Sequence, residues 1–305
     1  MVPSLATLIP AILHPIKYET SPAMPPERPT RTRQDAATDP AAGGIAAVST
    51  PGPGSLVRML GVLDQFAPDQ PVIRVDDLQL RLGYTKSTAY RYVKALCDAG
   101  LLAQASQGRY SLGPRIVELE RLMRIADPLL QAGEAVLPQL AAEIPNSMVL
   151  LCSLYRDKVL CVHREGPETI ETGGRRISIL RARGLPLPLF QGAASLAILA
   201  SLPTPRVRAL FLHRQAEMMA AGLGEDWHAV RQRLLGIRRD GQVTTVGRYN
   251  RHLAAVSVPV RSRDGAQVAG SLTRILAADA YTEQDAARLA QGLRAGAGQV
   301  SALLC

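Results

Sequence analysis

The stretch that decides the fold is Leu78–Gly100, which reads LQLRLGYTKSTAYRYVKALCDAG. A leucine-rich segment ends at Gly83, and glycine commonly closes a helix because it tolerates a left-handed backbone. Thr85 follows two residues later and is a suitable cap for a further helix over residues 86–99, which Gly100 would close. Two short helices joined across so short a turn predict a helix-turn-helix.

The second of these helices has one apolar and one polar face. Ala89, Val93 and Leu96 are spaced i, i+4, i+7, as expected of residues that pack inward. The other face carries cationic and hydroxyl side chains, which bond guanine edges and phosphates. On this helix and its cap, the residues predicted to contact DNA are Thr85, Lys86, Ser87, Thr88, Tyr90 and Arg91. The alternative interpretation is a helical hairpin whose polar face is solvated and touches no DNA.

The segment after Gly100 predicts a β-hairpin. Residues 101–104 and 109–113 are two short strand-like runs on either side of a Ser/Gln/Gly turn. As a wing beside the helices, this hairpin would place Arg109 against the DNA backbone or the minor groove. Upstream, Ser55 is predicted to cap a helix of 3.6-residue apolar spacing that ends near Phe66. A wing added to the helix-turn-helix favours DNA binding over the solvated hairpin.

The length of 305 residues suggests about two domains, and a hydrophobic content of 47% rules out a wholly disordered chain. Residues 1–53 are rich in Pro, Ala, Thr and Gly and are predicted to form a disordered arm. The winged helix-turn-helix spans 54–113, a connecting helix 114–127 and a second domain 128–305. The connecting helix is amphipathic, so it either pairs with its copy in a dimer or packs on the wing.

The second domain is predicted to alternate strands with flanking helices. Apolar, β-prone runs flank residues 155–158 and predict a hairpin in which Cys152 lies opposite Cys161. A helix over 227–233 leads into a predicted turn at 237–241. The other predicted elements are a helix over 128–143, strands over 242–246, 253–260 and 267–275, and a terminal helix over 281–304. The predicted fold class is therefore α+β and multidomain, with a C-terminal domain of α/β build.

The positive charge of the chain does not lie in the predicted DNA-binding segment. The formal net charge is +9, from 35 Lys and Arg against 26 Asp and Glu. Residues 55–113 carry 7 basic and 5 acidic side chains, whereas residues 146–305 carry 21 and 12. The DNA prediction thus rests on spacing rather than on bulk charge. The surplus in the second half indicates either an Arg-rich composition or an anionic ligand.

Two features of the second domain suggest a site for such an anion. Arg175, Arg176, Arg181 and Arg183 form a cluster whose guanidinium forks match carboxylates, although the same cluster also fits a solvated loop. The run Gly192-Ala193-Ala194-Ser195 places small residues at a predicted turn from a strand into a helix. The N-terminus of a helix binds carboxylates readily, because its first backbone N–H groups are free. From these features the candidate effector-binding residues are Arg175, Arg181, Gly192, Ala193, Ala194 and Ser195.

Catalytic and metal motifs are lacking in the sequence. The five His are scattered, and there is no Gly-x-Ser-x-Gly, His-Glu-x-x-His or phosphate-binding glycine loop. Cys152, Cys161 and His163 have no correctly spaced fourth ligand, and free cysteine commonly packs as a small apolar residue. We therefore expect no enzyme activity, no metal and no cofactor.

The sequence favours a cytoplasmic protein. Met1–His14 lack the positive region and the cleavage site of a secretory signal, and no run of ~20 uninterrupted apolar residues occurs. The four cysteines are few and irregularly spaced, which does not indicate a disulfide framework. No membrane association is expected.

Residues 55–113 resemble the winged helix-turn-helix of the IclR-type transcriptional regulators. The residues that carry the resemblance are Ser55, Leu63, Leu78, Leu82 to Thr88, Tyr90-Arg91, Leu96, Gly100-Leu101 and Tyr110 to Pro114. The resemblance continues through the second half of the chain. The matching segments there are the Tyr155–Val162 hairpin, the small-residue helix at 192–202, Ile237 to Gly241, and Val256–Val260 followed by Asp264-Gly265.

The resemblance implies a homodimer or dimer of dimers, a pseudo-palindromic double-stranded DNA operator and a GAF-like effector-binding domain. Effectors in this family are often small organic acids from catabolic pathways. Ser195-Leu196 stands where a Gly-Lys pair is usual, and Arg248 stands where the family places a carboxylate. Arg248 thereby joins the candidate effector-binding residues, because these changes make the pocket more apolar in one place and more basic in another.

Two functional hypotheses follow. The first is a ligand-responsive DNA-binding regulator of a catabolic operon for a small anionic organic effector, with aromatic acids among the candidates. The second is a DNA-binding protein whose C-terminal domain only oligomerises and binds no effector. Effector identity, operator sequence and the sign of regulation are not encoded in any motif that we find.

Overall fold

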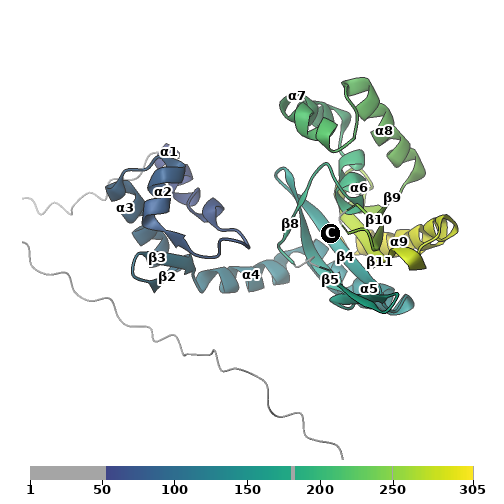
Figure 1. Ribbon diagram of the computed structural model, residues 1–305, viewed down its shortest axis with the longest axis horizontal. Coiled ribbons are helices and arrows are strands. Elements are labelled where there is room, and N and C mark those ends of the chain that lie inside the picture. The colour runs from purple at the N-terminus through teal and green to yellow at the C-terminus, as the bar shows by residue number, and fades with distance from the viewer. Residues whose placement is uncertain (1–52, 180–182, 249, 305) are drawn as a thin grey trace, which may run out of the picture. The chain divides into compact units, whose positions relative to one another are not determined.

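The computed structural model describes residues 53–179, 183–248 and 250–304 (Figure 1). Residues 1–52 of the predicted arm and the candidate effector residue Arg181 lie outside these ranges. The described elements confirm the mixed helix and strand architecture, with a helix-turn-helix followed by a separate mixed domain.

The N-terminal domain is the predicted winged helix-turn-helix. Gly83 adopts a left-handed backbone (φ +65°) at the end of the first helix of the helix-turn-helix, and the Oγ1 of Thr85 accepts the Thr88 amide at 3.3 Å at the start of the second. The elements are α1 (Pro53–Leu60), β1 (Ile73–Arg74), α2 (Val75–Leu82), α3 (Lys86–Asp98), β2 (Leu102–Ser106) and β3 (Arg109–Leu112). The strands form one sheet in the order β1-β3-β2, so the short extended segment before α2 pairs with the wing, a pairing that was not predicted.

The first helix differs from its prediction. It begins at Pro53 and ends at Leu60, and a 3-10 turn at Leu63–Gln65 follows. The prediction that Ser55 caps the helix is wrong, because this residue lies inside α1 and its Oγ is 2.9 Å from the hydroxyl of Tyr92. The hydroxyl therefore joins α1 to α3.

The described C-terminal domain is built on a six-stranded antiparallel sheet in the order β8-β5-β4-β11-β10-β9. Its strands are β4 (Met148–Tyr155), β5 (Lys158–Glu165), β8 (Pro186–Pro188), β9 (Val243–Val246), β10 (Leu253–Arg261) and β11 (Val268–Ala277). The predicted register is confirmed, since Cys152 pairs with Cys161 across β4 and β5. A small hairpin of β6 (Thr169–Thr172) and β7 (Arg175–Ser178) lies outside the main sheet.

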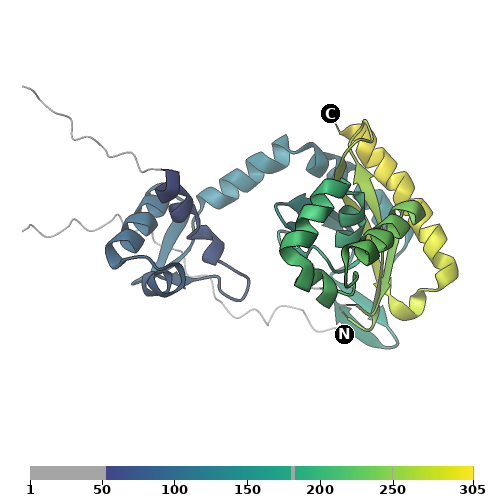
Figure 2. The same cartoon turned by 90° about the horizontal axis from the view of Figure 1, so that it is seen from above.

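Helices cover both faces of this sheet. The helices are α5 (Pro128–Glu143), α6 (Ala193–Ser201), α7 (Thr204–Ala220), α8 (Trp227–Asp240) and α9 (Glu283–Leu303). One apolar core lies between the sheet and α6 to α8, and a second lies between the sheet and the pair α5 and α9. Figure 2 shows the green helices and the yellow α9 on opposite sides of the strands. The core residues are mainly Leu, Val, Ile and Ala.

The predicted turn at residues 237–241 is wrong. Helix α8 continues through Ile237 to Asp240, and Gly241 ends it with a left-handed backbone (φ +66°). A basic last turn at Arg238 and Arg239 suits the negative end of the helix dipole. The Asp240-Gly241 pair therefore marks the end of α8 rather than a separate turn before the next strand.

The residues predicted to form a connecting helix are helical over α4 (Arg115–Ala126). None of its side chains, all of which are described, is buried. Among the helices of the described ranges, none combines the length and the apolar character that crossing a bilayer requires.

Candidate functional site

The exposed face of α3 carries the side chains predicted to contact DNA. Lys86, Ser87, Tyr90 and Arg91 are exposed, and Thr88 is half-buried. Ala89, Val93 and Leu96 are buried in the domain core, as predicted. Thr85 is exposed, but its hydroxyl is engaged within the helix start, where it bonds the amide and the hydroxyl of Thr88. This residue therefore opens the helix and holds its first turn.

The guanidinium group of Arg91 contacts an aromatic residue of the same helix. Its guanidinium carbon is 5.5 Å from the ring centroid of Tyr92, a cation–π distance. The hydrogen bond with Ser55 lowers the pKa of Tyr92, and Arg91 and Arg58 lower it further. The ring of Tyr84 packs edge-on against that of Tyr92, with centroids 5.5 Å apart. These contacts fix the backbone that presents the exposed face.

The wing contributes two neighbouring cations rather than one. In the β1–β3 register Arg74 pairs with Arg109, and both side chains are exposed. Arg109 is the predicted wing contact, whereas Arg74 was missed. The extended segment before α2 carries Arg74, but only its pairing with the wing places the two cations together.

The Gly192–Ser195 segment lines a small pocket at the N-terminus of α6. Gly192 has a positive φ of +80° and precedes the helix, so the chain turns sharply from β8 into α6. The cavity has a volume of about 40 Å³. Its lining residues are Leu150, Leu187, Gln191, Gly192, Ala193, Ala194, Ser195, Thr245, Ala255, Thr273 and Ile275.

A buried hydroxyl in this pocket is left without a partner. Ser195 is fully buried, and its Oγ finds no hydrogen-bond partner among the described residues. Unsatisfied buried polar atoms are uncommon and costly in folded proteins. Nearby, the hydroxyl of Ser271 donates to the carbonyl of Ala194 at 3.0 Å, which holds the first turn of α6 on the sheet. The pocket thus offers a fixed, unused polar group within an apolar lining.

The structure does not bring the described candidate arginines, Arg175 and Arg248, to this pocket. Arg175 is exposed on β7, and Arg248 donates to the carbonyl of Ala221 at 2.8 Å. Arg183 donates to the carbonyl of Val162 and pairs with Glu120 of α4. The lining residues from the strands, such as Thr273, were not predicted. They come together only through the strand order of the sheet, which no local pattern encodes.

Models of known families match most of the chain. The IclR helix-turn-helix domain matches residues 55–106, and the bacterial transcriptional regulator IclR C-terminal domain matches residues 126–302. The regulator KipR of Bacillus subtilis is 22% identical over 249 residues, which are 81% of this chain and 95% of KipR. The probable regulator ArcR of Halobacterium salinarum is 24% identical over 66% of this chain and 74% of its own length.

Solved structures share the fold. A putative IclR regulator from Silicibacter sp. TM1040 aligns with a TM-score of 0.67 at 22% identity, covering 81% of this chain and 95% of its own. An IclR homologue from Microbacterium hydrocarbonoxydans, solved with 4-hydroxybenzoate, aligns with a TM-score of 0.62 at 23% identity, covering 82% and 98%. Since one family model alone matches more than half of the residues, this chain belongs to the IclR family of DNA-binding transcriptional regulators, which are not enzymes.

Proposed function

We propose that the chain is a cytoplasmic, ligand-responsive regulator that reads a pseudo-palindromic operator with α3 and the wing. The α3 contacts are Lys86, Ser87, Thr88, Tyr90 and Arg91, with Thr85 at the helix start. The exposure of Lys86, Tyr90 and Arg91 on α3 suits entry into the major groove, because arginine and lysine bond guanine edges and phosphates there. Arg109 and its neighbour Arg74 bind the adjacent backbone or minor groove.

The effector is a small organic acid bound at the start of α6. The observation that carries this assignment is the unpartnered, fully buried Oγ of Ser195 in a pocket next to a helix N-terminus. Amide groups at such a terminus favour a carboxylate, and the apolar lining suits a hydrocarbon or aromatic body. The 4-hydroxybenzoate bound by the Microbacterium homologue supports an aromatic acid, and the regulated operon would then be one for its catabolism. The cavity of about 40 Å³ must widen to admit a ring, so binding moves its walls.

Replacing Ser195 with alanine separates ligand binding from stability. Because the hydroxyl has no protein partner, its removal should leave the melting temperature unchanged or slightly raised. Loss of one hydrogen bond to the acid, worth about 1 kcal/mol, should weaken acid binding by roughly fivefold. A thermal-shift screen of aliphatic and aromatic acids finds the ligand, and calorimetry on both proteins gives the two affinities.

The exposed Ser178 on β7 provides the control, because Ser178→Ala removes the same hydroxyl far from this pocket's lining and should change nothing. If no acid shifts the wild-type chain, the C-terminal domain serves only to oligomerise, and the effector proposal is wrong. If Arg175→Ala abolishes binding while Ser195→Ala does not, the carboxylate is held by the arginine cluster instead.

The connecting helix pairs with a second copy of the chain. On α4 the side chains of Val117, Leu122 and Ile125 are 71%, 55% and 57% exposed. A row of exposed large apolar residues along one helix marks a surface that another protein covers. A dimer formed here would supply two recognition helices, which is what a pseudo-palindromic operator requires.

Replacing Leu122 with glutamate should therefore weaken self-association at least about tenfold, because a charge must be desolvated in the apolar contact. Sedimentation equilibrium of the full chain measures the change. Arg121→Glu alters charge on the same helix at an exposed position and should have a smaller effect. A Leu122→Glu chain that associates as tightly as the wild type would show that α4 is not the contact.

A further inference from the structure

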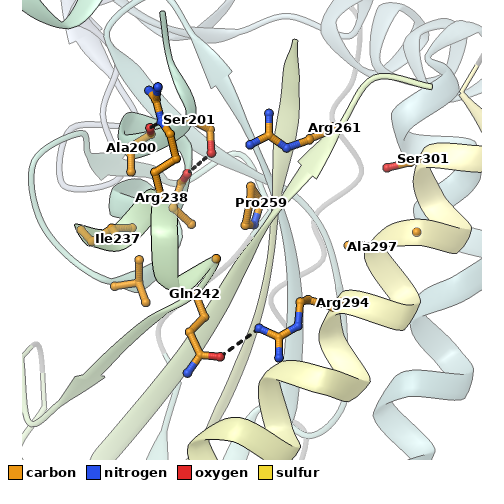
Figure 3. A pocket seen from close by; sticks show the side chains of 14 residues that line it. Ala200, Ser201, Ile237, Arg238, Gln242, Pro259, Arg261, Arg294, Ala297 and Ser301 are labelled. Atoms are coloured by element: carbon orange, nitrogen blue, oxygen red, sulfur yellow. Dashed lines mark hydrogen bonds between the residues drawn. The ribbon is translucent and has the colours of Figure 1, made fainter. Parts of the chain in front are cut away.

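A second and larger cavity lies at the edge of the main sheet. Strand β9 pairs with β10 only over Ala254 to Ser257, so within the described ranges the far end of β10 has no partner strand on that side. Pro259 lies on this edge, and proline has no backbone N–H that would need a partner there. The cavity at this position has a volume of about 370 Å³ (Figure 3). That volume falls in the usual range for small-molecule sites.

Small residues on two helices create the space. Helix α6 contributes Ala197, Ala200 and Ser201, which are spaced i, i+3, i+4 on one face. Helix α9 contributes Ala297, Gly298 and Ser301, which with Arg294 are spaced i, i+3, i+4, i+7. Long side chains at these positions would fill the cavity. None of its described lining residues is shared with the pocket around Ser195.

Three arginines line the same cavity. Arg238 donates to the carbonyls of Ala200 and Leu202, each at 2.9 Å, and Arg294 donates to the Oε1 of Gln242 at 3.1 Å. Figure 3 shows Arg261 next to Pro259 and the guanidinium of Arg294 directed toward Gln242.

The described lining of the cavity supplies no negative charge to balance these arginines. Arg261 is half-buried, and its side chain makes no hydrogen bond or ion pair with any described residue. None of the described lining residues is acidic, so three positive charges share one cavity without a carboxylate. Like charges repel when they are brought together, and an anion in their midst would remove that cost.

We propose that this cavity is a second ligand site, for an organic carboxylate with an extended apolar body. Arg261 and Arg294 hold the carboxylate, since guanidinium groups bind carboxylates with two charge-assisted hydrogen bonds. The apolar body lies against the small-residue faces of α6 and α9. The site accounts for part of the positive surplus of residues 146–305, and it is independent of the effector assignment at Ser195.

Octanoate is a suitable probe, with octan-1-ol as its uncharged match. Titration calorimetry of the full chain should detect octanoate binding and at least roughly tenfold weaker binding of the alcohol. Arg261→Gln should weaken octanoate binding at least roughly tenfold without loss of structure, because no protein partner is given up. Arg263→Gln removes the same charge two residues away, at an exposed position outside the lining, and should leave the affinity unchanged.

Gly298→Leu tests the apolar part of the site. A Cβ at Gly298 meets no atom within 4 Å, and Gly298 lines the cavity, so a larger side chain here should occupy part of that space. Leucine also has a higher helix propensity than glycine, so the melting temperature should stay the same or rise while octanoate binding is lost. The proposal is overturned if the wild type binds no octanoate, or if Arg261→Gln and Gly298→Leu both bind it normally. Octanoate binding that is lowered only by Ser195→Ala would place it in the other pocket and would also refute this site.

Discussion

Replacing Arg91 with alanine is expected to abolish specific operator binding while the chain stays folded and associated. The side chain is exposed on the outer face of α3, where an arginine that bonds a guanine provides about 1–3 kcal/mol of discrimination. Its loss should lower operator affinity by roughly 10- to 100-fold, toward the level of non-specific binding. Within the protein only the contact with the Tyr92 ring is lost, so the change in stability should stay within about 1 kcal/mol.

The measurement is fluorescence anisotropy at fixed salt, with a duplex that the wild-type chain has selected from random sequences. Arg121→Ala on α4 is the control, because it removes an equally exposed arginine from outside the winged helix. An Arg91→Ala chain with unchanged operator affinity would refute the assignment of α3 as the recognition helix. Lys86→Ala should instead weaken all duplexes alike and flatten the salt dependence, if Lys86 binds phosphate.

Replacing Arg274 with alanine should destabilise the C-terminal domain by about 2–4 kcal/mol. This arginine on β11 is 1% exposed, and burial lowers its pKa. It donates to the Oγ of Ser147 at 2.9 Å and to the carbonyl of Leu140 at 2.7 Å, and its Nη2 lies 3.5 Å from the Oε2 of Glu143. The alanine variant leaves a cavity and an unsatisfied carbonyl between α5 and the sheet.

Urea unfolding of the two proteins gives the difference in the free energy of unfolding. Arg288→Ala is the control, because its side chain is 76% exposed and pairs with Asp285 in solvent. Such exposed pairs contribute less than about 1 kcal/mol. If Arg274→Ala unfolds at the same urea concentration as the wild type, the hydrogen bonds described above do not join α5 to the sheet.

The N-terminal fold could be predicted because its signals are local. Gly83, Thr85 and Gly100 each act on the backbone within a few residues, and the spacing of the buried residues on α3 follows directly from helix geometry. The pairing of Ile73–Arg74 with the wing was not predicted, because this segment is only two residues long and is defined by its partner β3. For the same reason, the sequence alone did not show that Arg74 lies next to Arg109.

The pocket around Ser195 could be predicted only in part. The small residues from Gly192 onward mark a tight turn into a helix, and this is a local property of the chain. Thr245 and Thr273 line the same pocket from β9 and β11, and only the order of strands brings them there. The direction of a long side chain is set by packing, so Arg248 could not be placed from the sequence.

The structure shows where the cationic side chains of the two halves of the chain lie. The winged helix-turn-helix carries few cations, and Lys86, Arg91 and Arg109 among them are exposed on its surface. The C-terminal surplus includes Arg238, which fixes the end of α6, and Arg261, which faces a cavity without an acidic partner. Net charge alone would have assigned the DNA contact to the wrong half of the chain.

The central claim, that a small acid in the C-terminal domain controls DNA binding, is tested most directly by operator affinity as a function of acid concentration. For the full chain, the acid found by thermal shift should change the operator Kd by roughly 5- to 150-fold, and operator should change the acid affinity by the same factor. Ser195→Ala should keep the acid-free operator Kd and need more acid for the same change. An acid that binds the C-terminal domain and leaves the operator Kd unchanged would contradict the claim.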